Sequence, residues 1–350
     1  MTLVNSSNPE SSSRRKQLAF SLVELLLAVS LMSLIVFGLY SMFNETQKAL
    51  RANVTQVDVL EAGRAAIELI VADLEQATTP GLGVYQTLPV RPATPPHFMS
   101  GIMTNRLGGQ TIAAMPVTQS LADGSLRTNV LQETFFLTRS NLNWVARGFF
   151  VSPTTNPVAV ATSGELNFGT LFRFSSPNVD FNARNLNDIF QPQRRMTTNL
   201  FNNLWDVYRR TKADGNFAVS NLVASPLIEG VVHFRVQPVD SLGRPMRYWT
   251  NNPVAEQFNF RYPSVALVRD QAPGRSSFVT ETRSAFYGDS LPAYVEVEIG
   301  VLDQSTLARV KALGNTALSK DYLNREPGGV HLFRRMIPIR TAPKMHRVLQ

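Results

Sequence analysis

The sequence contains no cysteine at any of its 350 positions. A chain without thiols can form no disulfide, no cysteine-ligated zinc site and no thiol nucleophile. This absence does not assign a redox compartment, because exported proteins can also lack cysteine.

Charged residues are scarce as well, at 17% of the chain, whereas 21 prolines and 20 glycines are present. Soluble domains usually carry about 25% charged residues. With 44% hydrophobic residues, the chain is long enough for one large domain or two ordinary ones. The mixture favours a turn-rich β architecture over a helical bundle.

No long basic run accompanies the formal net charge of +8, since the longest is Arg14-Arg15-Lys16. Residues 1–19 hold three basic side chains and one acidic one, so their removal lowers the net charge to +6. A solvated basic surface is therefore favoured over a nucleic-acid-binding head.

The N-terminus holds the strongest pattern. Residues 1–19 are polar and end in the basic cluster, and residues 25–44 are 20 consecutive uncharged, mostly apolar residues. As a helix this run would be ~30 Å long, which matches the hydrocarbon thickness of a bilayer. The basic flank predicts a cytoplasmic N-terminus and export of everything that follows.

A carboxylate, Glu24, lies directly before this run. A cleaved secretory signal would end in a small-residue site, which Gly38–Glu45 does not provide. A plain signal anchor explains the length but not an acidic residue that costs energy in lipid. A buried core helix does not explain the basic flank.

The segment Leu18–Leu27, which reads LAFSLVELLL, resembles the type III signal of type IV prepilins and type II secretion pseudopilins. The resemblance implies cleavage between Ala19 and Phe20 by a prepilin peptidase that also N-methylates Phe20. Ala19 departs from the glycine usual before the cut. Glu24 becomes the fifth mature residue, which in this family acts in filament assembly.

Cleavage would create an amine at Phe20 that Glu24 of a neighbouring subunit can neutralise. Such a pair removes two charges from an apolar helical bundle and sets the axial register between subunits.

The apolar run continues as an amphipathic pattern, and no proline occurs between Pro9 and Pro80. One helix is predicted from about Phe20 to Ala77, with Gly38 and Gly63 as its weak points. Its second half should pack on the protein's own head through a stripe that Arg64 interrupts: Val57, Leu60, Ile67, Val71 and Leu74.

The predicted fold class is α+β and pilin-like. The expected parts are a leader at 1–19, a transmembrane helix at 20–44, its amphipathic continuation at 45–79 and a periplasmic β-rich head at 80–350. Residues 80–125 should form long loops with short strands. Further strands are predicted at Glu133–Arg139, Trp144–Ser152, Thr170–Ser175, Gly230–Val239, Pro292–Asp303 and Val330–Arg340, and short helices at Asn199–Arg210 and Ser305–Leu313.

Two segments sharpen the resemblance. Pro226–Val236 and Leu291–Ile299 resemble successive strands of J-type minor pseudopilins and W-type minor pilins. The head exceeds typical members, chiefly through residues 80–225.

No catalytic motif is recognisable. His97, His233, His331 and His346 have no ligand-spaced partner, and Asp214-Gly215-Asn216 is too short for a calcium loop. No cofactor or metal is expected, and the chain is expected not to be an enzyme.

The sequence thus predicts a structural minor pseudopilin of a type II secretion-like system, in the inner membrane with a periplasmic head. Its expected partners are the prepilin peptidase/N-methyltransferase and other pseudopilins or pilins. A minor pilin of a type IV pilus, serving adhesion, motility or DNA uptake, is the alternative. A membrane-tethered enzyme with an unrecognised site is a third possibility.

Overall fold

In the computed structural model the chain divides into two compact units, Met1–Val54 and Thr55–Gln350. The structure describes residues 21–80, 95–107, 110–114, 117–121, 123–140, 143–152, 165–177, 198–213, 223–247, 257–259, 262–270 and 281–341.

Helix α1 (Leu22–Leu74) has 53 residues, begins in the first unit and ends in the second. Neither Gly38 nor Gly63 interrupts it. A turn follows, and Ala77 then forms a β-bridge with Thr138. The predicted helix end near Ala77 is therefore confirmed, and its predicted start at Phe20 lies outside the described residues.

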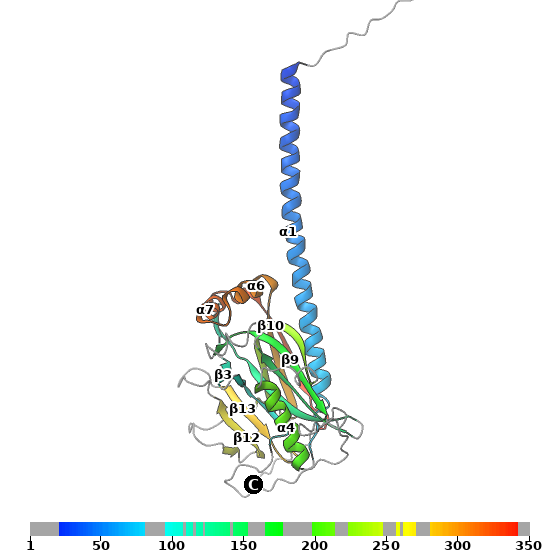
Figure 1. The fold of residues 1–350 in the computed structure, drawn as a ribbon, viewed down its shortest axis with the longest axis vertical. Helices are drawn as coiled ribbons and strands as arrows, with labels where there is room; N and C mark the ends of the chain where they lie inside the picture. Colours follow the sequence, from blue (N-terminus) through cyan, green and yellow to red (C-terminus); the bar gives the residue numbers. More distant parts are fainter. Residues whose placement is uncertain are drawn as a thin grey trace, which may run out of the picture. The chain divides into compact units, whose positions relative to one another are not determined.

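The second unit is built on a ten-stranded sheet whose neighbouring strands are all antiparallel (Figure 1). The strand order is β11-β12-β13-β1-β6-β7-β9-β10-β14-β15. The strands are β1 (Phe98–Ile102), β6 (Gln132–Ser140), β7 (Asn143–Ser152), β9 (Gly169–Pro177), β10 (Ala224–Val239), β11 (Gln257–Asn259), β12 (Tyr262–Asp270), β13 (Glu281–Phe286), β14 (Tyr294–Leu302) and β15 (Val330–Pro338). With α1, this sheet confirms the α+β class.

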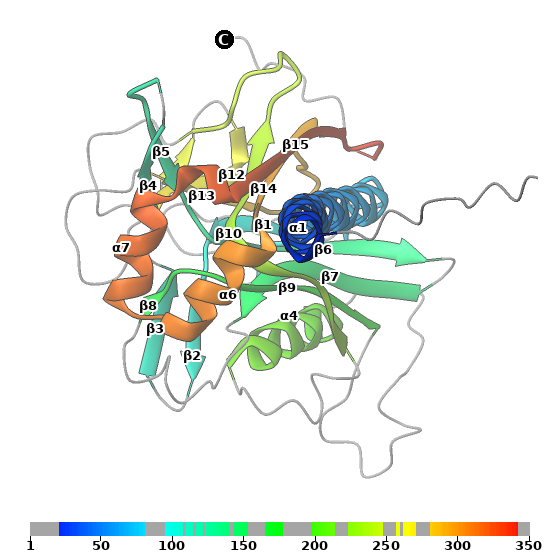
Figure 2. The ribbon, with the colours of Figure 1, turned by 90° about the horizontal axis from the view of Figure 1, so that it is seen from above.

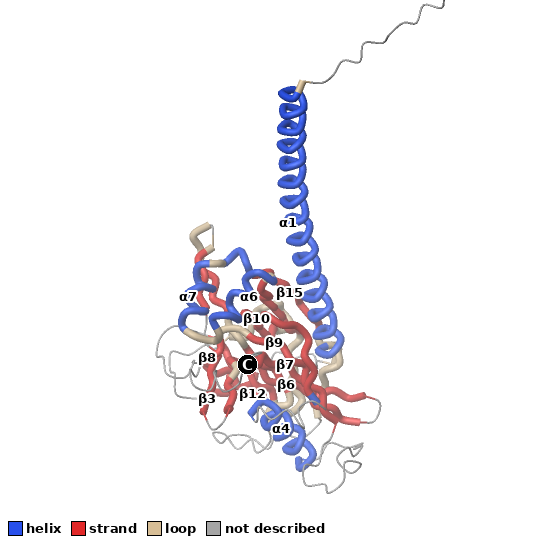
Figure 3. The backbone as a smooth tube through the Cα atoms, turned by 45° about the horizontal axis from the view of Figure 1, so that its top comes forward, coloured by secondary structure: helices blue, strands red, loops and turns tan. Residues whose placement is uncertain are grey.

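Smaller elements surround this sheet. One three-stranded sheet contains β2 (Thr104–Leu107), β3 (Gln110–Ala114) and β8 (Glu165–Leu166), and a hairpin contains β4 (Val117–Ser120) and β5 (Leu126–Asn129). The other helices are α4 (Thr198–Ala213), α6 (Gln304–Leu313), α7 (Ala317–Arg325) and the 3-10 turn η1 (Pro327–Gly329). Figure 3 shows these helices in blue around the red strands.

The hairpin, α6 and α7 form a small lobe beside the large sheet (Figure 2). The buried Gln119 amide donates to the carbonyl of Leu323 over 2.7 Å. It also accepts hydrogen bonds from Arg127 and Asn129. The lobe has its own apolar cluster, which includes Val117, Leu307 and Leu323.

The large sheet curls, so that the residues at the start of β6 contact β10, although β7 and β9 lie between these two strands in the sheet order. Leu131 forms a parallel bridge with Phe234, and Phe234 N donates to Val130 O over 2.7 Å. Val236 N donates to the side chain of Gln132 over 2.8 Å. Two register shifts in the β10–β9 pairing accompany this curl.

The predicted alternation of β14 is confirmed. Val295, Val297, Ile299 and Val301 are buried, whereas Glu296 and Glu298 are only half-buried. In β10 two residues of the predicted polar face are covered and the third, Arg235, is half-buried. The two covered residues, His233 and Gln237, are buried with the apolar residues.

The two faces of β7 and β9 are covered by different helices. Tyr208 of α4 packs against Phe135, Phe150 and Phe174, with ring centroids 5.1–6.4 Å apart. Because neighbouring residues of a strand point to opposite faces, Arg147 projects away from α4, beside Gly148. Position 148 accepts only glycine, because an added Cβ would collide with the backbone oxygen of Thr134 and lie 3.0 Å from the Tyr208 ring.

The second half of α1 covers the opposite face. Its buried side chains follow three- and four-residue steps, as expected for a helix packed on one side. They are Ala66, Ile67, Ile70, Asp73 and Leu74. Ile67, Val71 and Leu74 thus pack as predicted. Val57 does not, because it is 58% exposed; the packed face begins instead at Val59, which is closer in phase to Gly63 and Ala66.

Candidate functional site

The first turn of α1 carries the predicted assembly residue, Glu24. The carbonyl of Ser21 accepts the first helical hydrogen bonds, from Glu24 N at 2.9 Å and Leu25 N at 3.1 Å. Glu24 thus lies at the N-terminal end of the helix, where the helix dipole favours a negative charge. Ala19 and Phe20, the predicted processing residues, lie outside the described residues.

Around and beyond Glu24 the helix is apolar on all sides. Residues Leu22–Leu50 contain an 18-residue segment with a mean hydropathy of 2.5, and the stretch is long and apolar enough to cross a membrane. None of that segment is buried within the described protein, and Phe37, for example, is 74% exposed. So large an apolar surface requires lipid or another protein as its environment.

Several polar side chains of this stretch are satisfied by the helix itself. The hydroxyls of Ser30, Ser33 and Thr46 each donate over 2.8 Å to the carbonyl four residues earlier. The Glu24 carboxylate has no ion-pair partner within the described part of the chain. It is therefore the group of the apolar stretch that most needs a partner from outside.

The second half of α1 is joined to the sheet by a buried charge cluster. Asp73 is 3% exposed and accepts two hydrogen bonds from Arg173 of β9. Arg173 Nε donates over 2.6 Å and Arg173 Nη2 over 2.9 Å. Arg147 of β7 also donates to Asp73. One carboxylate thereby connects the helix to two neighbouring strands.

The two arginines respond differently to this shared carboxylate. The hydrogen bonds to Asp73 raise the pKa of Arg173. Burial lowers the pKa of Arg147, although Asp73 opposes that effect. The difference is consistent with exposure, because the Arg147 side chain is 13% exposed and that of Arg173 27%. Both remain cationic at neutral pH, so removal of Asp73 would leave two positive charges close together.

Close contacts continue along α1. At Gly63 an added Cβ would collide with the Phe333 ring of β15, so the helix approaches that strand at a residue without a side chain. Beyond the helix, Thr78 N donates to Leu137 O over 2.9 Å, and Arg340 pairs with Glu75 over 2.6 Å. This half of α1 is thus an integral part of the second unit.

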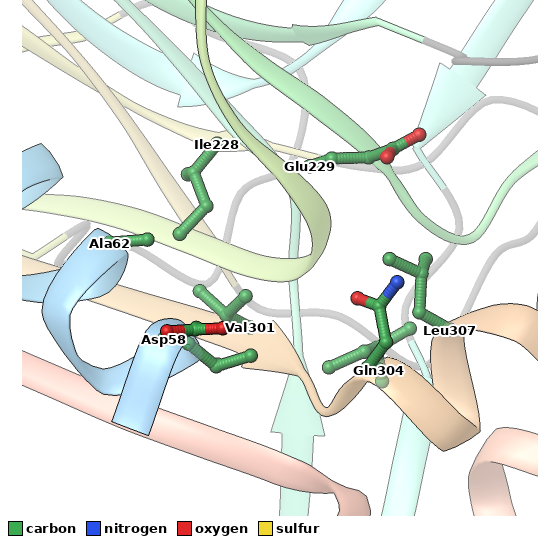
Figure 4. Close-up of a pocket in the computed structure, with 9 residues that line it drawn as sticks. Asp58, Ala62, Ile228, Glu229, Val301, Gln304 and Leu307 are labelled. Atoms are coloured by element: carbon green, nitrogen blue, oxygen red, sulfur yellow. The ribbon is translucent and has the colours of Figure 1, made fainter. Parts of the chain in front are cut away.

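A groove of about 390 Å³ lies next to this packed helix (Figure 4). Its lining residues come from four elements: Asp58, Val59 and Ala62 of α1, Ile228 and Glu229 of β10, Val301 and Leu302 of β14, and Gln304 and Leu307 at α6. Ile228 and Val301 belong to the main core, whereas Leu302 and Leu307 belong to the lobe cluster. The groove therefore lies on the seam between the two apolar clusters.

Two other buried ionisable groups have structural partners. His97 is 1% exposed, and its Nε2 lies 2.7 Å from the carbonyl of Ser290. Burial lowers the pKa of His97 to about 4, so it is neutral at physiological pH. Tyr208 donates to buried Glu133 over 3.1 Å, and burial raises the pKa of Tyr208.

His233 also acts within the fold. Its Nδ1 accepts the backbone N–H of Val130 over 3.1 Å, so its Nε2 carries the proton that faces Glu298 at 3.3 Å. The hydrogen bond from His233 lowers the pKa of Glu298. This arrangement fastens the β5–β6 connection to the sheet.

The described residues bring together no group of three or more His, Cys, Asp or Glu that could hold a metal ion. His97, His233 and His331 lie on separate elements, and His346 is outside the described residues. Trp144 is buried and Trp205 packs against the core, so neither is placed to bind a ligand on the surface.

Sequence reasoning missed the Asp73–Arg147–Arg173 cluster. One signal was present, because Asp73 lies three residues after Ile70 and so shares the buried stripe of α1. Its two partners come from strands far away in sequence, and only the sheet brings them together. The groove was also not foreseen, since its four elements are not contiguous.

No protein-family model, curated protein or solved structure matches the chain. What the protein does must therefore be inferred from its own residues and geometry.

Proposed function

We propose that this chain is a pilin-like filament subunit, a minor pseudopilin of a type II secretion-like system. The observation that carries the proposal is Glu24, a carboxylate in the first turn of α1, whose first half is apolar and exposed. The prepilin-like segment around Ala19, Phe20 and Glu24 supports it. The helix would anchor the subunit in the inner membrane before assembly and join the filament core afterwards.

The second half of α1 supports the same proposal. It is packed on the sheet through apolar side chains and the Asp73 cluster. A force applied to the apolar half would therefore be transmitted to the folded head through the same helix. A subunit that is pulled from the membrane into a filament needs such a connection.

We propose a place at or near the filament tip, because so large a head would be hard to repeat densely along a filament. The second unit comprises residues Thr55–Gln350. In this role the chain has no catalysis of its own. It initiates assembly and presents a surface to cargo or to other subunits.

Two measurements test the proposal: the sequence of the mature N-terminus and the assembly of a Glu24 variant into filaments. Sequencing should find N-methylated Phe20 as the first residue. Glu24→Gln should insert in the membrane and be processed normally but be lost from sheared or purified filaments. The matched control, Glu45→Gln, changes an exposed glutamate of the same helix that pairs with Lys48 and should assemble normally. A mature protein that begins at Met1 would contradict the proposal.

A minor pilin of a type IV pilus is the second candidate, favoured by the +6 charge that remains without residues 1–19. A DNA-uptake pilin would bind DNA strongly at low salt and lose affinity steeply as salt rises. Absence of DNA binding at low salt would remove the DNA-uptake version. Subunit counting also tests the tip position, because the most abundant subunit of a filament cannot be confined to its tip.

A further inference from the structure

The groove between α1 and the α6 lobe has an apolar floor and an acidic rim. Val59, Ile228 and Leu302 are among its apolar residues, and Asp58 and Glu229 supply carboxylates. Figure 4 shows Asp58 and Glu229 on different elements of the lining. Both an apolar side chain and a cationic one could therefore be bound there.

The charges of the rim are not balanced within the described residues. Glu229 pairs with Lys311 over 2.7 Å. Asp58 is exposed and has no ion-pair partner in the described part of the chain. The rim therefore carries one uncompensated negative charge at neutral pH. The same charge disfavours phosphate groups, nucleic acid and anionic lipid headgroups as occupants.

Apolar surface continues from the groove along α1. Val57, directly before the groove residue Asp58, is 58% exposed. Ala62 adds only a small side chain to the lining of the groove. A helix lying beside this part of α1 could thus place one apolar side chain in the groove and a further one on Val57.

We propose that the groove binds an amphipathic helical segment of a different filament subunit, one that inserts an apolar side chain and places a Lys or Arg at Asp58. This inference rests on the proposed function, because a subunit present in few copies has other subunits as its neighbours. The apolar side chain would close the seam between the two clusters. The cation would neutralise Asp58, which gives the contact its orientation.

The exposure of Gln304 in the lining of the groove allows a direct test. A photo-crosslinking amino acid is placed at Gln304 in the full-length chain, in cells that make the complete assembly. Ala312 provides the control position, because it is exposed on the same helix and does not line the groove. We expect a discrete adduct from position 304 and none from 312. Mass spectrometry should find the partner peptide to be an apolar helical segment with a Lys or Arg.

The charge requirement is tested in the same background. Asp58→Lys should reduce the adduct by up to about fivefold, which is the upper end of what a single exposed ion pair contributes. Glu68→Lys makes the same charge change on an exposed residue of the same helix outside the groove and should leave the yield unchanged. Reversal of the partner's Lys or Arg to Glu should restore the adduct of the Asp58→Lys chain.

Other outcomes overturn the proposal. An adduct to lipid, to a second copy of this chain or to a peptide without basic residues identifies a different occupant. Equal losses with Asp58→Lys and Glu68→Lys show a nonspecific charge effect. If the chain begins at Phe20 and assembles but gives no adduct, the groove proposal fails and the filament role stands. If the chain begins at Met1 and gives no adduct, both fail.

Discussion

The two halves of α1 differ in what surrounds them, although they belong to one helix. Between Leu22 and Val54 every residue whose exposure is described is exposed, and most are apolar. Between Val59 and Leu74 one face is buried against the sheet and carries a charged cluster. The first half is therefore incomplete without lipid or other subunits, whereas the second half finds its partners within its own chain.

This contrast teaches that the two acidic residues, Glu24 and Asp73, perform different tasks. Asp73 has two arginines inside the fold. Glu24 has no ion-pair partner in the described part of the chain. Removal of Asp73 should affect folding, and removal of Glu24 should affect assembly.

The largest expected effect is that of Asp73→Ala. It leaves Arg147 and Arg173 buried in part without their carboxylate, and loss of one partner from a buried ion pair costs about 3–5 kcal/mol. The discount for the partial exposure of Arg173 places the expected loss near the lower end. Denaturant unfolding of the detergent-solubilised chain measures it. Glu68→Ala, at an exposed site of the same helix, should change the free energy of unfolding by less than about 0.5 kcal/mol.

The next largest effect is a pH dependence of the free energy of unfolding, which should be confined to the second unit. Burial lowers the pKa of His97 to about 4 in the folded protein, below the ordinary histidine value of 6.5. As the pH falls, His97 therefore takes up a proton at a higher pH in the unfolded chain than in the folded one. Stability is complete above pH 6.5 and declines as the pH falls to about 4, by up to about 3 kcal/mol.

Unfolding experiments between pH 7 and pH 4 test this dependence. His97→Gln should lower stability at pH 7 but flatten the pH profile, because Gln cannot titrate. His331→Gln, which changes a half-buried histidine of β15, should retain the wild-type slope. An unchanged slope in His97→Gln would contradict the assignment.

A smaller effect on stability is expected when either glycine of α1 is replaced by alanine. Because one glycine lies in each half of the helix, the two variants allow a direct comparison of the halves. Gly63→Ala should destabilise by roughly 1–2 kcal/mol, since overpacking against Phe333 outweighs a gain of about 1 kcal/mol in helix propensity. At Gly38 an added Cβ meets nothing within 4 Å. Gly38→Ala should therefore leave thermal unfolding of the head unchanged, and equal effects at both sites would refute the contrast.

The smallest effect on folding is expected from Glu24→Gln. Because Glu24 is exposed, its replacement should change the free energy of unfolding by less than about 0.5 kcal/mol. The same variant should be deficient in assembly. Coupled losses of stability and assembly would show that Glu24 also serves the fold.

Much of the secondary structure could be predicted from local patterns. The predicted strands at Glu133–Arg139 and Trp144–Ser152 are β6 and β7, and the helix predicted at Ser305–Leu313 is α6. These segments have clear periodicity and turn signals at their ends. Helix α7 and strands β12 and β13 were not predicted. Helix α7 has only nine residues, and its cap depends on Thr316 and Ser319.

The error at Val57 has a physical cause. The apolar spacing continues through Val57, but the described head offers no surface that buries it. Periodicity shows which side of a helix is apolar, not where along its length the packing begins. The exposed residue is instead available to a partner.

By itself, the sequence determined the long apolar helix, the position of Glu24 within it and the β-rich character of the rest, because all three depend on neighbours in the chain. Only the tertiary structure decided that Asp73 meets Arg147 and Arg173, that His97 is buried and neutral, and that four elements form an acidic-rimmed groove. Those features depend on strand order and on the curl of the sheet, which bring together residues up to about 250 positions apart, a separation that no local pattern encodes.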